Sequence, residues 1–489
     1  MKQLEDYWPV GRWRTSTPEE QGMDSELLVQ TCNFARQHGL HIHSLLIIRH
    51  GYAVVDAYFH PFLPGTMHDL ASCTKSFTAT LIGIAVDKGF IKSVKQPVLG
   101  FFPNNRVANL TDLKKELTLE HLLTMTSGMA CYNEPGEITL REMFQSPDWR
   151  QFVLDLPMIE PSGTRFEYCS PGSHLLSAIV RETTGMSTLA FAREYLFGPL
   201  GIDAVWPEDP QGINHGWGDL HMTPHDMARL GYLYLHKGQW ENRTIVSPQW
   251  VSAATKKHSS PPAGPSPIHG YGYQWWLFTP EIYYADGRGG QMIIVVPEAD
   301  VVAVTTAGLS DDEKQRLDEM LISFIIPSIR SSTPLPVNPD GVAQLESGIR
   351  QPILYRDEPE RPPVLPPAAQ QITGQTYLLE SNILGWREFS FIFNELEEAL
   401  FLPAIGSESY EFRLGLDNVF RLNPEARFGL PAMLKGKWHQ PDTFTVYWDE
   451  VANINRWQMD FTFEGDSVTI QAQESSWHGG VTVNGKLKK

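Results

Sequence analysis

Cysteine is scarce in this 489-residue sequence: there are four, at positions 32, 73, 131 and 169, and no two of them form a C-x-x-C pair. A zinc site of the paired-cysteine kind is therefore excluded, and there is no H-E-x-x-H sequence that would bind zinc from a helix. We expect no metal and no cofactor. We also expect all four cysteines to be free, buried thiols in a reducing cytoplasm.

Basic residues and long apolar runs are also scarce. Lys and Arg number 39 against 57 Asp and Glu, which gives a formal net charge of −18. An acidic surface repels nucleic acid and anionic membranes, so we expect neither as a partner. No apolar run approaches the roughly 18 residues that span a bilayer. Residues 1–20 contain no apolar segment of the signal-peptide type.

The length predicts two domains, with three as the alternative. Two hairpins, at residues 45–58 and 291–306, each consist of apolar strands joined by a turn sequence. Between them the pattern is mostly helical, including a buried helix from Ser72 to Lys88 that stops at Gly89. Strands from both ends of a region with helices inserted between them predict an α+β domain, in which helices flank one antiparallel sheet.

The composition changes after this region. Residues 333–372 are rich in proline, which predicts a stiff, extended linker. Short stretches that alternate at period two follow, at residues 389–393, 443–447 and 459–463. Several such strands predict a small antiparallel β-barrel. We therefore divide the chain into residues 1–332, 333–372 and 373–489, and find no repeat of fixed period.

Ser72 and Lys75 form the S-x-x-K sequence of this chain. Alone, the pair is weak, because about one such match arises by chance in a chain of this composition and the polar face of a surface helix explains it. The residues after Lys75 are small and apolar, however, so the helix is predicted to be buried. Residues i and i+3 share a helix face, so the amine can take the serine proton, and burial lowers a lysine pKa toward neutrality.

Two further segments carry polar groups at structural junctions. Tyr168 and Ser170 lie just before a helix that Pro171 opens, where both hydroxyls can face one cleft; a buried, hydrogen-bonded tyrosine is the alternative. The sequence Arg288-Gly289-Gly290-Gln291 leads into a strand, and its glycines would let a substrate approach the main chain; a plain glycine turn is the alternative.

These segments, in this order, resemble the class C β-lactamase family, the broad group of penicillin-recognising serine hydrolases that includes esterases and D-amino-acid peptidases. The likeness covers roughly residues 10–330, and the tail resembles the lipocalin-like extension of some members. The resemblance implies that Ser72 forms an acyl-enzyme. It implies that Lys75 and Tyr168 share the proton transfers, with the base unassigned, and that the backbone N–H groups of Ser72 and Gln291 form the oxyanion hole.

The sequence departs from the family pattern at two positions. Ser170 stands in place of Asn, and the implied role is to bind a substrate amide or relay protons. Arg288-Gly289-Gly290 stands in place of Lys-Thr-Gly, and we expect Arg288 to bind a substrate carboxylate and to help keep Lys75 neutral. Both departures argue against a dedicated β-lactamase.

Other candidates have simpler explanations. Cys73 and Cys169 flank the proposed site residues, but free cysteine is most often a small buried hydrophobe. The aromatic residues of 269–276, HGYGYQWW, could line an acyl pocket or simply pack the core. No G-x-S-x-G sequence supports an α/β-hydrolase.

We predict a serine hydrolase that cleaves an ester or amide bond of a small molecule or short peptide. The alternatives are a catalytically silent relative that binds an acyl or peptide ligand, a β-lactamase, an acyltransferase, or an interaction protein that acts through its tail. The intact set of Ser72, Lys75 and Tyr168 argues against a silent pocket. The sequence leaves the substrate, the role of the tail and the formation of a homo-oligomer open.

Overall fold

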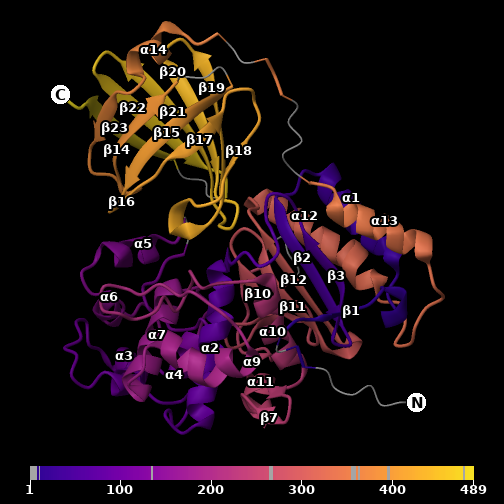
Figure 1. The fold of residues 1–489 in the computed structure, drawn as a ribbon. Coiled ribbons are helices and arrows are strands. Elements are labelled where there is room, and N and C mark those ends of the chain that lie inside the picture. The colour runs from indigo at the N-terminus through magenta and orange to yellow at the C-terminus, as the bar shows by residue number, and fades with distance from the viewer. Residues whose placement is uncertain are drawn as a thin grey trace.

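The computed structural model describes residues 8–9, 11–133, 136–263, 268–353, 359–361, 364–393, 397–476 and 480–489. Figure 1 shows a central sheet with helices on both faces, a lobe of helices beside it, and a barrel formed by the C-terminal part of the chain. None of the helices in the described ranges combines the length and the apolar character that crossing a bilayer requires.

An eight-stranded sheet organises the first part of the chain. Its strand order is β1 (Arg14–Thr15), β3 (Tyr52–Tyr58), β2 (Ile42–Arg49), β12 (Val301–Ala307), β11 (Gln291–Val296), β10 (Tyr283–Gly287), β9 (Trp276–Leu277) and β8 (Gly270–Tyr271). Only the pair β1–β3 is parallel. Pairing of β12 with β2 joins the two predicted hairpins into one sheet, so the α+β prediction is confirmed.

Successive residues of a strand point to opposite faces of the sheet. Because the central strands are apolar at successive positions, both faces of the sheet are apolar. On one face, Ile48 and Val302 pack with α2 (Thr74–Asp87) and α10 (Pro224–Leu235). On the other, Ile47 and Ala303 pack with α1 (Ser25–Gln37) and α12 (Asp311–Met320), which continues as η6 (Leu321–Ile325) and η7 (Ile326–Ser328). The sheet is thus sealed on both sides, as Figure 1 shows.

The helical lobe lies between the two hairpins in sequence. Apart from α2 and α10, its helices are α3 (Asp112–Glu116), α4 (Leu119–Leu123), α5 (Ile138–Gln145), α6 (Trp149–Asp155), α7 (Ser170–Thr184), α8 (Thr188–Ala192), α9 (Gly198–Leu200) and α11 (Pro248–Ala254). The predicted helix from Ser72 to Lys88 corresponds to a 3₁₀ turn, η2 (Ala71–Cys73), followed by α2. Every residue of α2 from Thr74 to Ala85 is buried.

The predicted extended linker is wrong in part, because it contains α13 (Pro339–Arg350) and α14 (Pro367–Ile372). Asn338 caps α13, and Pro339 occupies the first turn, where proline is tolerated. The helix packs on α1, where Arg36 donates a hydrogen bond to the carbonyl of Gly348 at 2.8 Å. Some of the prolines in this segment therefore begin helices, although the proline content alone predicted an extended chain.

The predicted C-terminal barrel is confirmed. Its closed ring is β14 (Trp386–Ile392), β13 (Thr376–Leu379), β23 (Gly480–Leu487), β22 (Ser467–Glu474), β21 (Arg456–Glu464), β20 (Thr443–Asp449), β19 (Ala432–Gln440), β17 (Phe412–Gly415) and β15 (Glu398–Ile405), with β16 (Glu408–Ser409) and β18 (Arg421–Asn423) attached. Pairing of β15 with β14 closes the ring. Aromatic side chains such as Phe391 and Phe461 fill the interior.

The β20–β21 loop of the barrel, residues 450–455, contacts the first part of the chain. Val451 and Ala452 are fully buried in a cluster with Phe62. The carbonyl of Ala452 accepts a hydrogen bond from the amide of Asp69 at 3.1 Å. The barrel is therefore seated directly on the segment that precedes Ser72.

The expectation of four free thiols is wrong for two of them. Cys131 and Cys169 form a disulfide with their Cα atoms 5.7 Å apart, whereas Cys32 and Cys73 are free and buried. The pair is separated by 38 residues and meets only because the loop after α4 lies against the start of α7. The cytoplasmic expectation was based on four free thiols, and the disulfide removes this support. The location of the protein stays a prediction from the sequence.

Candidate functional site

Ser72 lies in a strained turn between the short strand β4 (His68–Asp69) and α2. The preceding residue, Ala71, has φ of 44°, a left-handed conformation that is uncommon outside glycine. Asp69 Oδ1 accepts a hydrogen bond from the Ala71 amide at 2.8 Å and so fixes this turn. As a result the Ser72 side chain is half-buried at the edge of an otherwise buried helix.

Lys75 points back along the helix to Ser72. Its Nζ donates to Ser72 Oγ at 2.8 Å and to the carbonyl of Trp217 at 3.0 Å. The lysine is 1% exposed. Burial lowers the pKa of Lys75 to about 8, although the carboxylates of Glu137 and Asp219 act in the opposite direction. A large share of this lysine is therefore neutral slightly above physiological pH.

Tyr168 completes the group. Its ring centroid lies 4.8 Å from Lys75 Nζ, so the phenol lies beside the Ser72–Lys75 pair. Trp276 stacks on the ring at 5.9 Å between centroids. Burial raises the pKa of Tyr168 well above its usual value. The phenol is thus protonated at neutral pH, which makes Lys75 the better proton acceptor of the two.

Ser170 is the first residue of α7 and is buried, and the role that the resemblance implied for it stays a prediction. Its Oγ donates to Glu137 Oε1 at 2.7 Å. Glu137 precedes α5 and was not predicted as a site residue. No motif in the sequence marks it, because 33 residues separate it from Ser170.

The glycine turn before β11 lies beside Ser72. The thiol of Cys73 donates to the carbonyl of Gln291 at 3.1 Å, and a Cβ on Gly287 would lie 2.5 Å from the carbonyl oxygen of Leu70. Gly289 and Gly290 have φ of 78° and 90°, which only glycine adopts without strain. The turn therefore depends on its glycines and brings the start of β11 against the η2 turn.

Arg288 forms contacts with three residues that lie far from it in the sequence. Its Nη2 donates to Asn455 Oδ1 at 2.9 Å, its Nη1 donates to Ser476 Oγ, and Glu474 Oε2 lies 3.7 Å away. All three partners belong to the barrel. Arg288 is thus held by the barrel, and its binding of a substrate carboxylate stays a prediction. Burial is the main cause of the lowered pKa of Lys75.

Some of the aromatic residues of 269–276 pack in the core, and one lines the site. Tyr271, Tyr273 and Trp275 are buried in the core around α2 and α10. Trp276 is half-buried and contacts Tyr168, so it forms part of the site wall.

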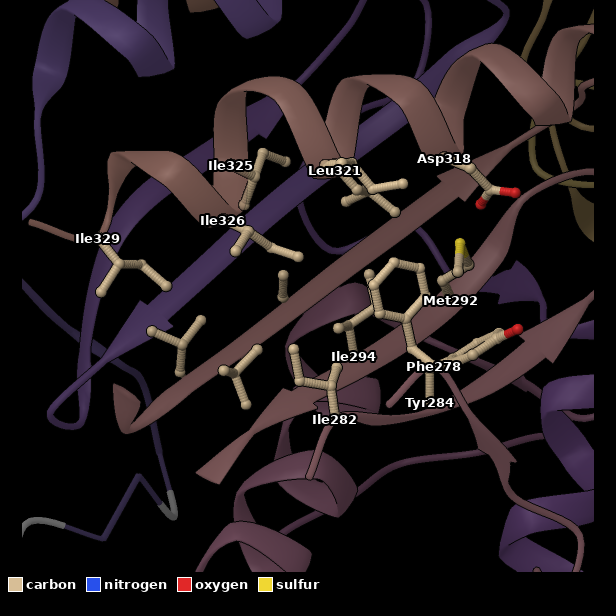
Figure 2. A pocket seen from close by; sticks show the side chains of 14 residues that line it. Phe278, Ile282, Tyr284, Met292, Ile294, Asp318, Leu321, Ile325, Ile326 and Ile329 are labelled. Atoms are coloured by element: carbon tan, nitrogen blue, oxygen red, sulfur yellow. The ribbon is translucent and has the colours of Figure 1, made fainter. Parts of the chain in front are cut away.

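Two hollows lie away from Ser72. One is a groove of about 470 Å³ between the first part of the chain and the barrel, lined among others by Leu63, His221 and Phe428. The other is an apolar cavity between η6 and the sheet, on the face opposite α2; Figure 2 shows Leu321 and Ile325 above strand residues such as Ile294, with Asp318 at one end. Neither lining includes Ser72, Lys75 or Tyr168.

Comparison with known proteins shows the family of this chain. The family model described as Beta-lactamase matches residues 20–323. The 6-aminohexanoate-dimer hydrolase of Paenarthrobacter ureafaciens is 25% identical over 289 residues, which cover 55% of this chain and 73% of the relative. Penicillin-binding protein 4 of Amycolatopsis lactamdurans is 30% identical over 311 residues, which cover 52% and 80%.

Solved structures share the fold. A putative 6-aminohexanoate-dimer hydrolase from Bacillus anthracis superposes with a TM-score of 0.54 at 18% identity and covers 67% of this chain and 90% of its own. The family match spans more than half of the 489 residues and contains Ser72, Lys75 and Tyr168. This protein belongs to the Beta-lactamase family and is an enzyme of its serine-hydrolase type.

Proposed function

We propose that this enzyme hydrolyses an ester or amide bond of a small molecule or short peptide through an acyl-enzyme on Ser72. The observation that carries the proposal is the 2.8 Å hydrogen bond between Ser72 Oγ and the buried amine of Lys75, whose pKa of about 8 lets it act as a base. A silent binding protein would have no need of this pair.

The proposed reaction begins when neutral Lys75 takes the proton of Ser72 as Oγ bonds to the substrate carbonyl carbon. The resulting oxyanion would accept hydrogen bonds from the backbone N–H groups of Ser72 and Gln291. When the tetrahedral intermediate collapses, the bond to the leaving amine or alcohol breaks, and that group takes a proton from the Tyr168 phenol, which regains one from Lys75. Water, deprotonated by the same pair, then adds to the acyl carbon. The bond to Ser72 Oγ breaks, and Oγ takes back the proton from the pair as the acid product leaves.

The proposed substrate class follows from the site and the relatives together. The name of the Paenarthrobacter ureafaciens relative describes hydrolysis of a small amide, and relatives of this kind support an ester or amide as the substrate here. Arg288 and Ser170, which differ from the family pattern, both bind protein groups in this structure. The family name states kinship and does not identify the substrate.

We further propose the domain division 1–332, 333–372 and 373–489, with α13 packed on the first unit. The barrel shapes the site in this proposal, because its residues Asn455 and Ser476 hold Arg288.

A fluorophosphonate probe that labels activated serines tests the proposal. We expect one adduct per chain, on the peptide that contains Ser72, and none in Ser72→Ala. Lys75→Met should label much more slowly, whereas Lys88→Met, a change of an exposed lysine at the end of the same helix, should label like the wild type. An adduct confined to another serine would reject the proposal.

A further inference from the structure

Glu137 occupies an unusual position at the edge of the site. It has φ of 52° just before α5, a strained conformation for a residue other than glycine. Its side chain is half-buried, and Ser170 Oγ holds one carboxylate oxygen at 2.7 Å. The carboxylate is close enough to influence both Lys75 and Tyr168 electrostatically. Glu137 therefore lies near the proposed base and Tyr168, on the side of the site formed by Ser170.

Two other carboxylates around Lys75 have basic side chains as partners. Asp286 forms an ion pair with Lys314 at 2.6 Å, and Asp219 contacts His215 at 2.7 Å. Among the residues that the structure describes, Glu137 forms no ion pair with a Lys, Arg or His side chain. A half-buried carboxylate without a counter-charge is unfavourable unless a bound group supplies one.

The arginine of the glycine turn is held by the barrel and does not supply that charge. Arg288 is held by Asn455, Ser476 and Glu474 of the barrel. When Lys75 is neutral, as its role as a base requires, the Glu137 side of the space next to Ser72 therefore carries negative charge. Such a site repels acidic substrates and attracts cationic ones.

We propose that the Glu137 carboxylate, held by Ser170 beside Ser72 and Lys75, binds a primary ammonium group that the substrate carries near its scissile ester or amide bond. The inference rests on the proposed hydrolase function and names the substrate class. Ser170 acts as a positioning residue, because it donates to one carboxylate oxygen and leaves the other for the ligand.

Ammonium binding would also act on the base. The Glu137 charge is the strongest of the influences that raise the pKa of Lys75. A bound ammonium group offsets this charge, so Lys75 loses its proton more easily in the substrate complex. For ammonium substrates, the acidic limb of the kcat profile should thus lie at lower pH than that of kcat/KM. For N-acetylated substrates, which have no positive charge, the two limbs should coincide.

The test uses the full chain with p-nitroanilides of glycine, β-alanine, 4-aminobutyrate and 6-aminohexanoate, each with a free amine and N-acetylated. The readout is the ratio of kcat/KM for the free-amine substrate to that for its acetylated counterpart. In Glu137→Gln this ratio should fall about 10- to 100-fold for the best chain length, the range expected for a hydrogen bond between charged groups. Ser170→Ala should lower it less, and Glu142→Gln, an exposed change on α5, should keep the wild-type ratio.

The outcomes separate the two proposals. If the wild type cleaves both sets and Glu137→Gln leaves the ratio unchanged, the ammonium site is wrong and the hydrolase stands. If neither set is cleaved and the fluorophosphonate probe gives no Ser72 adduct, both are wrong. Should Glu137→Gln unfold, Glu137→Asp, which keeps the charge, must retain part of the preference; a ratio of one with intact folding would overturn the inference.

Discussion

Arg288 of the glycine turn and Asn455 of the barrel form a 2.9 Å hydrogen bond across the boundary between the two parts of the chain. The β20–β21 loop that contains Asn455 also places Ile454 where a Cβ on Gly289 would lie only 2.3 Å from its Cγ2 atom. The barrel thus contacts the turn whose backbone the proposed oxyanion hole uses. Substitutions in this loop should therefore change the rate of the reaction at Ser72 although the loop does not contact Ser72.

The first prediction concerns the effect of removing the hydrogen bond between Arg288 and Asn455. Asn455→Ala should raise KM and lower kcat/KM by about 3- to 10-fold, because the guanidinium is partly exposed and the hydrogen bond is correspondingly modest. In a double-mutant cycle, Arg288→Ala should make the Asn455 change nearly silent. Asn484→Ala, an exposed change on β23, is the control. Additive effects of the Arg288 and Asn455 changes would contradict the coupling.

The second prediction concerns the base. Lys75 must be neutral to take a proton, so kcat/KM should rise with pH through about 8 and level off above it. Lys75→Ala should lower kcat by about 10²- to 10⁴-fold, the usual contribution of general base catalysis. The pH profile of a neutral ester and the kcat of the variant are the measurements. A flat profile between pH 6 and 9 would assign the base elsewhere.

A buried row of histidines gives the third prediction. Asp449 of the barrel contacts His41 at 2.6 Å, His41 contacts His43 at 3.2 Å, and His43 contacts His68 at 2.8 Å. Burial lowers the pKa of His43 well below its usual value and that of His68 to about 3. Both are neutral in the folded state, while the unfolded chain takes up protons below about pH 6.5.

Stability should therefore be full above pH 6.5 and decline as the pH falls toward the folded pKa values. Between pH 6.5 and 5, protonation of each of the two histidines in the unfolded chain should lower the free energy of unfolding by about 2 kcal/mol. His68→Gln should show a smaller decline over this range, whereas His439→Gln, an exposed change in the barrel, should not. Urea unfolding at the two pH values measures this. An identical decline in His68→Gln and the wild type would argue against a buried neutral His68.

The fourth prediction concerns the disulfide between Cys131 and Cys169. Because Cys169 follows Tyr168 directly and caps α7, the bond holds the Tyr168 segment against the loop after α4. Cys131→Ala should lower the free energy of unfolding by about 2–4 kcal/mol, the typical contribution of a native disulfide. Unfolding with and without reductant gives the comparison, and Cys32→Ala serves as the control for a free buried cysteine. If reductant leaves the wild-type unfolding curve unchanged, the pairing does not form.

The sequence predicted those features that local patterns encode. Apolar alternation located both hairpins and the barrel strands, and the spacing of Ser72 and Lys75 on a buried helix, together with Tyr168, identified the groups that the structure brings together. The partners of Arg288 lie more than 160 residues away in the sequence, so no local pattern reveals them. Glu137 and the cysteine pair were missed for the same reason. The helix α13 was missed because proline can open a helix as well as extend a chain.

The central claim is an acyl-enzyme on Ser72 that depends on the Lys75 amine. Intact-mass measurement after rapid acid quench of a reaction with p-nitrophenyl acetate tests it most directly. We expect a transient gain of about 42 Da, one acetyl group, on the wild type and on Lys88→Ala, localised to the Ser72 peptide. Ser72→Ala should show none, and Lys75→Ala a strongly delayed gain. Release of p-nitrophenol by the wild type with no adduct on Ser72 at any time, and at the same rate by Ser72→Ala, would contradict it.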